Sequence, residues 1–279
     1  MNKYFKGMYF KCQSDTQTLA VIPAVHEVCG KQYYSIQVIT EDGAWYKKML
    51  TLDGVSFEEN GLELEIDKPN LRISGNLYFS QQTPIKYNIM GPFSFIPFME
   101  CRHSVYSMLH QVNGTVCIND KEYVFKNAYG YWEGDCGRSF PKEYSWTQSF
   151  IEGKDGAVEG SLMLSVADIP LAGLNFTGII GIVFWKGKEY RFATYLGARV
   201  VQKANGILLI RQGNMEIEAR LVEQKPHPLQ APVNGAMQRT IYENITCKAF
   251  YRFRKNGVTQ FAFETDKASF EYEYEWRKL

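Results

Sequence analysis

The sequence predicts an all-β protein in which two similar antiparallel β-barrels follow one another along the chain. Three observations lead to this fold class: a high aromatic content, turn dipeptides at short intervals, and apolar residues that alternate with polar ones. Tyr, Phe and Trp favour strands, and they make up 15% of the sequence. The 279 residues allow one large domain or two of ordinary size.

Alternation with a period of two is clearest in three segments. LELEID at 62–67 places apolar side chains on one face of a strand and acids on the other. MEIEAR at 215–220 and FEYEYEW at 270–276 repeat the pattern. This period is typical of strands with one buried and one solvated face. We therefore expect the glutamates of the C-terminal segment to face solvent.

Turn signals separate the expected strands. Asn-Gly and Asp-Gly pairs tolerate the positive φ angles that tight hairpins require. They occur at 42–43, 53–54, 60–61, 113–114, 155–156, 205–206, 234–235 and 256–257. The run QKPHPLQAP at 224–232 contains three prolines, which exclude a central strand and predict a long loop.

A weak internal repeat indicates how the strands group. GMYFK at 7–11 precedes two apolar strands and a turn, and YSWTQ at 144–148 precedes the same series. The order of features thus returns after about half the chain. This repeat predicts an N-terminal barrel at 1–139 and a C-terminal barrel at 140–279.

Composition narrows the class of function. The chain has 31 Lys and Arg against 30 Asp and Glu, a net charge of +1. Nucleic-acid binding rests on clustered basic residues, so a nucleic-acid partner is not expected. At 45% hydrophobic and 22% charged residues, the chain can bury a core.

The cysteines and the N-terminus indicate the compartment. Six cysteines form no CxxC pair, and no histidine cluster completes a zinc site. The start, MNKYFKGMYFKCQ, lacks the apolar core of a signal peptide. We expect reduced thiols in a cytoplasmic protein without a metal. The apolar stretch at 169–185 contains Pro170 and three glycines, so a loop and a buried strand are expected there rather than a spanning helix.

Familiar catalytic signatures such as GxSxG, HExxH, the P-loop and GxGxxG are absent from the sequence. Two segments nevertheless differ from ordinary strands: GPFSFIPFMECRH at 91–103 and GYWEGDCGRSFP at 130–141. Each combines aromatic residues with acids. Glycines allow close approach of a ligand, and desolvation among aromatic rings favours the protonated form of a carboxyl group. A proton donor is therefore expected here.

The candidate catalytic residues are Asp135, Glu133, Glu100 and His103. Asp135 is the first choice for the proton donor, or for a residue that positions one; the alternative is a salt bridge with Arg138. Glu133 alternates with Asp135 on one side of a continuing strand, as a coupled acid pair or as a solvated acid. Glu100 and His103 are expected to form a hydrogen-bonded pair, with a catalytic or a structural role.

The candidate substrate-binding residues are mostly aromatic. They are Tyr131, Trp132, Arg138, Phe140, Trp146, His110 and Phe98. Trp132 and Trp146 would line a cavity or belong to the core. His110 alternates with Tyr106 and Met108, which is typical of a core or lining histidine.

Long stretches of the chain resemble the bacterial branch of the tocopherol cyclase family. The resemblance rests on GPFSFIPFMECRHSVYSM, GYWEGDCGRSFPKEYSWTQSF, SLMLSVADIP, FKGMYFK at the start and LQAPVNGAMQRTIYENI near the end. It implies two tandem lipocalin-like antiparallel β-barrels packed together, related to carotenoid hydratases. It also implies closure of a chromanol ring, by addition of a phenol hydroxyl to a prenyl double bond without a cofactor.

Three positions depart from the family pattern. The family usually has Trp where this chain has Met8 and Cys136, and a basic residue where it has Gly134. We expect a wider pocket, and a substrate other than a tocopherol precursor.

Three hypotheses follow. The first is a cofactor-free cyclase, an isomerase in which an acid protonates an alkene, aromatic faces stabilise the cation and water is kept out. The second is a non-catalytic lipocalin-like carrier. The third is an isoprenoid hydratase, in which water captures the same cation. All three take a hydrophobic prenylated small molecule, which would permit transient membrane contact without a stable anchor. The oligomeric state is not predicted.

Overall fold

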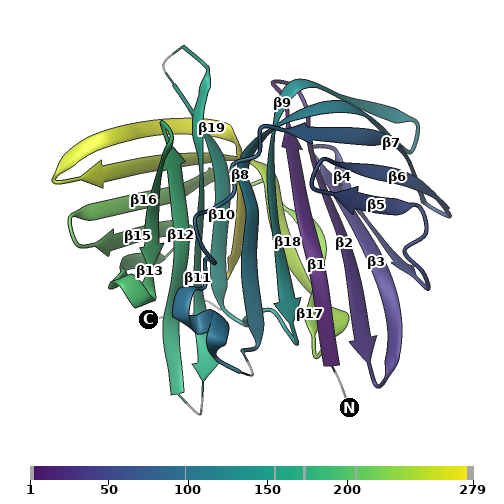
Figure 1. Ribbon diagram of the computed structural model, residues 1–279, viewed down its shortest axis with the longest axis horizontal. Helices are drawn as coiled ribbons and strands as arrows, with labels where there is room; N and C mark the ends of the chain where they lie inside the picture. The colour runs from purple at the N-terminus through teal and green to yellow at the C-terminus, as the bar shows by residue number, and fades with distance from the viewer. Residues whose placement is uncertain (1–2, 98, 154, 172–173, 205, 275–279) are drawn as a thin grey trace. The chain divides into compact units, whose positions relative to one another are not determined.

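The computed structural model describes residues 3–97, 99–153, 155–171, 174–204 and 206–274. These residues form antiparallel β-sheet almost throughout, together with the 3₁₀ helices η1 (Gly91–Phe95) and η2 (Thr194–Leu196) (Figure 1). The prediction of an all-β chain is confirmed. Within the described ranges, no helix is long and apolar enough to cross a bilayer.

The first sheet runs in the order β4-β3-β2-β1-β9-β8-β7-β6-β5. Its strands are β1 (Lys3–Gln13), β2 (Thr18–Val28), β3 (Lys31–Thr40), β4 (Gly43–Met49), β5 (Val55–Glu58), β6 (Gly61–Lys68), β7 (Leu71–Ser80), β8 (Cys101–Ile118) and β9 (Lys121–Gly137). Its first and last strands, β1 and β9, therefore lie side by side at the centre of the sheet.

The second sheet runs in the order β13-β12-β11-β10-β19-β18-β16-β15-β14, and β17 pairs with β18 off this path. Its strands are β10 (Tyr144–Glu152), β11 (Val158–Leu171), β12 (Leu174–Trp185), β13 (Lys188–Ala193), β14 (Arg199–Ala204), β15 (Ile207–Gln212), β16 (Met215–Glu223), β17 (His227–Val233), β18 (Ala236–Lys255) and β19 (Val258–Glu273).

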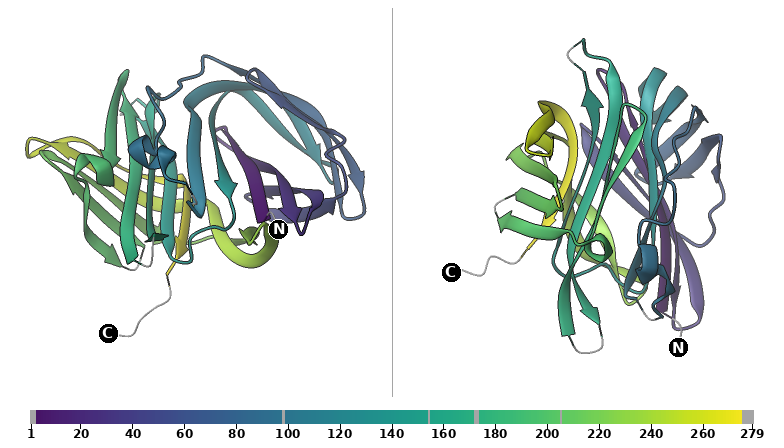
Figure 2. Two further views of the ribbon diagram at one scale, coloured as in Figure 1. Left: turned by 60° about the horizontal axis from the view of Figure 1, so that its bottom comes forward. Right: turned by 60° about the vertical axis from the view of Figure 1, so that its left-hand side comes forward.

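If β17 is left out, the strands of the second sheet follow the same order as those of the first. In each sheet the first strand pairs with the last, β1 with β9 and β10 with β19. Each sheet curves strongly (Figure 2). Closed barrels are not confirmed: in the described residues each hydrogen-bonded path ends at two different strands, β4 and β5 in the first sheet and β13 and β14 in the second.

Tertiary contacts divide the chain into two compact units. The first comprises Met1–Lys86, Cys101–Phe140 and Pro228–Thr240, and the second Tyr87–Glu100, Pro141–His227 and Ile241–Leu279. Two segments, Tyr87–Glu100 and Pro228–Thr240, thus belong to a different unit from the residues that flank them in the sequence. Tyr87–Glu100 connects β7 to β8 of the first sheet but belongs to the second unit.

The core of the first unit follows from strand alternation. In β6, Leu62, Leu64 and Ile66 are buried, whereas the acids between them are exposed. They join a core cluster with Phe10 of β1 and Trp132 of β9. Period-two patterning therefore predicted the buried face of this strand correctly.

The same interpretation is wrong for two other acids. Glu218 of β16 is buried and pairs with Arg220 and Arg252. Glu271 of β19 is also buried, and it accepts a hydrogen bond from the hydroxyl of Tyr144. The two acids can be buried because the arginines pair with Glu218 and the tyrosine hydroxyl donates to Glu271, which offsets the cost of removing the carboxylates from water.

Two turn predictions also fail. Asn113 and Gly114 lie inside β8 at a register shift rather than in a hairpin turn. A Cβ on Gly114 would lie 2.0 Å from the carbonyl oxygen of Asn76, so glycine serves a close approach of strands there. The proline-rich run contains β17, a strand that pairs on one side only, where proline is tolerated.

A buried histidine holds the segment Pro228–Thr240 against β2 and β3 within the first unit. His26 Nδ1 donates to the carbonyl of Gly235 at 3.1 Å, and Nε2 accepts from Ser35 Oγ at 2.8 Å. Its ring stacks on Tyr33. Burial lowers the pKa of His26 to about 4, despite the bond to Gly235. The folded protein therefore holds His26 neutral.

This neutral histidine should make the first unit sensitive to acid. Since the pKa of His26 is near 4 when folded and near 6.5 when unfolded, its stabilisation is present above pH 6.5 and is lost as the pH falls toward 4. In His26→Asn, the amide nitrogen can replace Nδ1 without titrating. We expect this variant to lose about 2 kcal/mol less free energy of unfolding between pH 7.5 and 5 than the wild type. Urea titrations at both pH values measure the difference; equal losses would contradict it.

Candidate functional site

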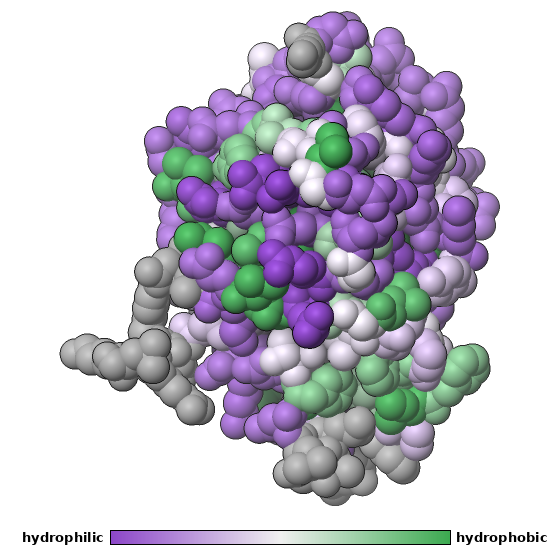
Figure 3. Space-filling view, turned by 90° about the vertical axis from the view of Figure 1, so that its left-hand side faces the viewer, coloured by the Kyte–Doolittle hydropathy of each residue, from purple (hydrophilic) through white to green (hydrophobic). Residues whose placement is uncertain are grey.

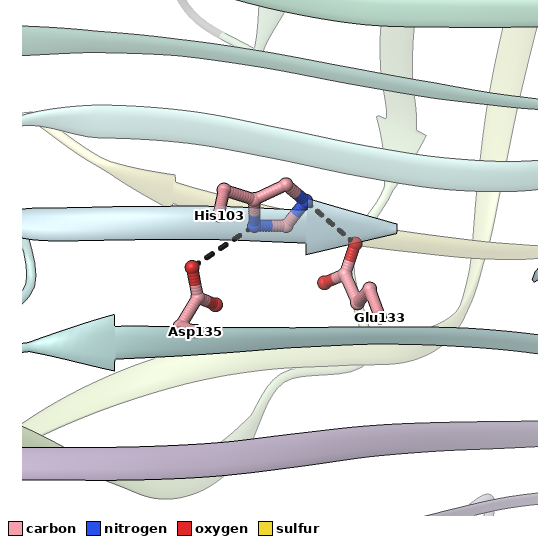
Figure 4. A group of neighbouring side chains, drawn as sticks. All are labelled: His103, Glu133 and Asp135. Carbon is pink, nitrogen blue, oxygen red and sulfur yellow. Dashed lines mark hydrogen bonds and ion pairs between the residues drawn. The ribbon is translucent and has the colours of Figure 1, made fainter. Parts of the chain in front are cut away.

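Three ionisable side chains meet where β8 and β9 pair in the first unit: His103, Glu133 and Asp135 (Figure 4). Glu133 and Asp135 are two residues apart on β9, so they share a face of the sheet. His103 lies directly opposite Asp135 on the antiparallel strand β8. The register alone therefore brings one histidine to two carboxylates.

Each carboxylate faces a different nitrogen of the imidazole ring. Nδ1 of His103 lies 2.9 Å from Oδ1 of Asp135, and Nε2 lies 3.1 Å from Oε2 of Glu133 (Figure 4). The first contact is a hydrogen bond, whereas the second is an ion pair without directed hydrogen-bond geometry. The side chains are 10% (His103), 6% (Glu133) and 23% (Asp135) exposed, so Asp135 is the member most open to solvent.

Charge, not burial, determines the ionisation of His103. Burial alone would lower the pKa of His103, but the carboxylates of Glu133 and Asp135 raise it well above its ordinary value. With a proton on both ring nitrogens, the imidazolium can serve both carboxylates at once. The site is therefore an anion–cation–anion arrangement.

Two further side chains hold the carboxylates. The hydroxyl of Tyr131, which is fully buried, donates to Oε2 of Glu133. Burial and the neighbouring charge of Glu133 raise the pKa of Tyr131 well above its ordinary value, so it remains a donor. The thiol of Cys101 lies 3.6 Å from Oδ1 of Asp135, the oxygen that also accepts from His103. Oδ2 of Asp135 has no partner among the described residues.

The donor set of the three residues also has the composition of a metal site, since one atom from each lies within 4.8 Å of the others. The orientation does not fit a metal ion. The carboxylates approach opposite nitrogens of a single ring (Figure 4), so an ion on either nitrogen would have only one of them beside it. Structural zinc needs four converging ligands. The arrangement fits a proton on His103 better.

The opposite face of the same strands is an aromatic core. Trp132, which lies between Tyr131 and Glu133 in the sequence, stacks on Phe10 at 5.1 Å and on Tyr106 at 4.7 Å between ring centroids. Adjacent residues of a strand point to opposite faces. Trp132 therefore packs in the core cluster and does not line the acid site.

His110 also belongs to this aromatic face. It packs on Phe79 and donates from Nδ1 to Ser107 Oγ at 3.1 Å. Burial lowers the pKa of His110 to about 4, so its ring is neutral. A Cβ on Gly130 would lie 2.1 Å from Nε2 of His110; glycine thus makes room for the ring. The interpretation of His110 as a core residue agrees with this packing.

Glu100, Arg138 and Phe140 are not the partners of His103 or Asp135 in the structure. Glu100 belongs to the second unit, and the partners of His103 are the acids of β9 instead. Arg138 is exposed and does not pair with Asp135, whose partner is His103. Phe140 packs on Phe5 at 5.5 Å.

Two further candidates lie elsewhere. Trp146 is buried in β10 of the second sheet. Phe98 lies outside the described residues. Among the predicted substrate contacts, Tyr131 touches the acid site, as a hydrogen-bond donor to Glu133.

The departures from the family pattern also lie on the aromatic face. Met8 pairs in register with Gly134 and is part of the core cluster. A Cβ on Gly134 would lie 2.9 Å from the sulfur of Met8. Cys136 shares this face by alternation along β9. The substitutions therefore alter the core beneath the site rather than the surroundings of the acids.

One residue of the site escaped the sequence analysis. Cys101 was interpreted only as a reduced thiol, and the structure forms no disulfide among the six cysteines, all of which are described. Its place two residues before His103 in β8 is the signal that would have identified it, because alternate residues share a face.

Comparisons with known proteins identify no family. A scan against models of protein families gives no match, and a search of curated proteins gives none either.

Solved structures show the fold. CghA bound to Sch210972 matches with a TM-score of 0.60 at 10% identity, over 98% of this chain and 89% of that one. Kievitone hydratase from Nectria haematococca matches with a TM-score of 0.53 at 10% identity, over 97% and 89%. An ATTH-related structure from Nitrosomonas europaea matches with a TM-score of 0.50 at 10% identity, over 98% and 92%. The chain shares the fold of these three solved structures; none of the three is named a tocopherol cyclase.

The four histidines of the chain make the charge arrangement measurable. In the NMR titration of the ring Cε1–H signals, we expect His103 to titrate above its ordinary pKa and His26 and His110 near 4. Single replacements assign the signals. In Glu133→Gln, the pKa of His103 should fall, because one of its two anions is removed. A wild-type His103 pKa at or below about 6.5 would refute the imidazolium assignment.

Proposed function

We propose that this protein is an enzyme that hydrates a carbon–carbon double bond of a hydrophobic prenylated molecule, with Asp135 as the proton donor. One observation carries the proposal. Both donors to Asp135, the ring of His103 and the thiol of Cys101, contact the same oxygen, Oδ1. The other oxygen, Oδ2, is left to carry and release a proton on the most exposed carboxylate of the site.

The reaction can be written with every proton accounted for. In the resting site both carboxylates are charged, so Asp135 first takes up one proton from solvent at Oδ2. The O–H bond at Oδ2 then breaks as the proton adds to the less substituted alkene carbon, which leaves a tertiary cation. The carboxylate left on Asp135 is stabilised by the charged donor His103 and by Cys101. Water adds to the cation and returns one proton to Asp135. The product is the substrate plus one water.

Glu133 and Tyr131 act on this step through His103. Glu133 keeps a proton on Nε2 by its charge, and Tyr131 holds Glu133 in place. Both are positioning residues in this scheme. An imidazole held in one orientation keeps its Nδ1–H directed at Asp135 throughout the cycle.

The likeness to kievitone hydratase supports hydration over the other addition chemistry. Ring closure is the second candidate, and it is favoured by the resemblance of GYWEGDCGRSFP to tocopherol cyclases. The two reactions share the proton donor and the cation, and differ only in whether water or a hydroxyl group of the substrate attacks. In either case the two sheets would serve as lipocalin-like barrels around a hydrophobic ligand.

The mass of the product separates these functions. Purified protein is incubated with kievitone and with a panel of prenylated hydroquinones, and products are resolved by chromatography with mass detection. We expect a product one water heavier than its substrate, and a rate at least about 100-fold lower in Asp135→Asn. Asp67→Asn, the same change at an exposed acid of β6, is the matched control and should leave the rate unchanged.

Each other outcome has a definite meaning. A product of unchanged mass would replace hydration by cyclisation. Full turnover by Asp135→Asn would remove Asp135 from the mechanism. Bound but unconverted ligand would overturn the proposal in favour of a carrier.

A further inference from the structure

The segment Tyr87–Glu100 is held in the second unit by a buried arginine. Arg191 of β13 donates to the carbonyl oxygens of Tyr87 at 2.9 Å and Asn88 at 3.0 Å, and its guanidinium lies 3.7 Å from the centre of the Tyr87 ring. Its charge is balanced by Glu189 at 3.0 Å. Two hydrogen bonds and one ring contact of the Arg191 guanidinium thus fix the start of the segment.

Tyr195 of η2 fixes the next turn. Its hydroxyl donates to the carbonyl of Ile89 at 3.1 Å, and its ring occupies the space beside Gly91. Gly91 has a φ of +52°, and a Cβ there would lie 2.4 Å from that ring. Only glycine fits this position. Phe93 then packs on Phe176 at 5.7 Å and on Tyr195 at 6.1 Å.

This anchoring presents apolar side chains to solvent instead of burying them. Phe95, at the end of η1, is 88% exposed, and Leu196 of η2 is 45% exposed. We call Pro92, Phe93, Phe95 and Leu196 the apolar tip. Apolar side chains form several patches among polar ones on the face shown in Figure 3, and η1 is the blue coil in Figure 1. Single exposed apolar residues are common, but the segment that carries Phe95 is anchored at Tyr87 and Asn88 by the buried Arg191.

We propose that the apolar tip inserts into the surface of a lipid bilayer. Charge indicates this partner. Residues 87–99 contain no Asp, Glu, Lys or Arg, and neither do residues 169–185, which include Phe176. Charged side chains are unfavourable below the headgroups, so a membrane-inserting surface must lack them. Protein interfaces, in contrast, are usually larger and have a polar rim.

The order of side chains along the tip agrees with this partner. Phe95 is more exposed than Leu196, whereas Tyr195 lies nearer the anchor, where its hydroxyl accepts from Arg191 and donates to the carbonyl of Ile89. Tyrosine is enriched at the headgroup level of membranes. Burying Phe95 and Leu196 should each strengthen partitioning roughly tenfold or more, which gives weak and reversible binding. This binding is independent of the proposed catalysis, since it requires neither substrate nor turnover.

Flotation of the full chain with vesicles of pure phosphatidylcholine tests the proposal. We expect the wild type to float with the vesicles, and Phe95→Ser to bind at least about tenfold more weakly. Phe95→Leu should retain most of the binding, because it preserves the apolar surface. Leu50→Ser is the matched control: Leu50 is 86% exposed in the first unit, and its replacement should change nothing.

Four results would overturn the proposal. They are no flotation of the wild type, an equal loss in Leu50→Ser, binding that requires anionic lipid and disappears in salt, and a dimer in sedimentation analysis that Phe95→Ser dissolves. The last result would identify a second copy of the chain as the partner of the tip.

Discussion

The imidazolium of His103 organises the acid site, because it lies between Glu133 and Asp135 with one ring nitrogen facing each. Two carboxylates on one face of a strand would repel each other without the positive charge between them. Leaving one partner of a buried ion pair alone costs about 3–5 kcal/mol. The register of β8 against β9 is therefore both a structural and an electrostatic requirement, because a shift by one residue would turn His103 to the other face.

The alternation of β9 gives one strand two functions. Trp132 stacks between Phe10 and Tyr106, whereas its neighbours Tyr131 and Glu133 hold the proton on His103. The aromatic packing on one face and the paired charges on the other thus share the strand pair β8–β9. The two histidines of β8, His103 and His110, lie on opposite faces of the sheet and differ in ionisation. Burial without an anion lowers the pKa of His110 to about 4, while two anions raise that of His103 despite burial.

The sequence pattern predicted features that depend on neighbouring residues of one strand. The alternation of β6 and the common face of Glu133 and Asp135 are correct because a strand has a period of two. The partner of His103 could not be inferred in the same way. Glu100 is close in sequence, yet the partners come from β9, through a pairing that register shifts in β8 make irregular. The buried Glu271 likewise depends on Tyr144, a residue from the other end of its sheet's sequence. Contacts between distant segments, and bulges, are set by tertiary packing.

The acid site accounts for the proposed first step, proton transfer to the alkene, but does not decide what attacks the cation afterwards. Asp135, His103 and Cys101 can deliver a proton and stabilise the carboxylate that remains, and this is common to hydration and ring closure. The attacking group is then decided by whether the substrate brings its own hydroxyl close to the cation before water does. Met8 and Gly134 cannot decide it directly, because they pack in the core on the opposite face. Under the proposed function, product choice would therefore depend on the residues that shape the bound substrate, and proton delivery on the strand pair β8–β9.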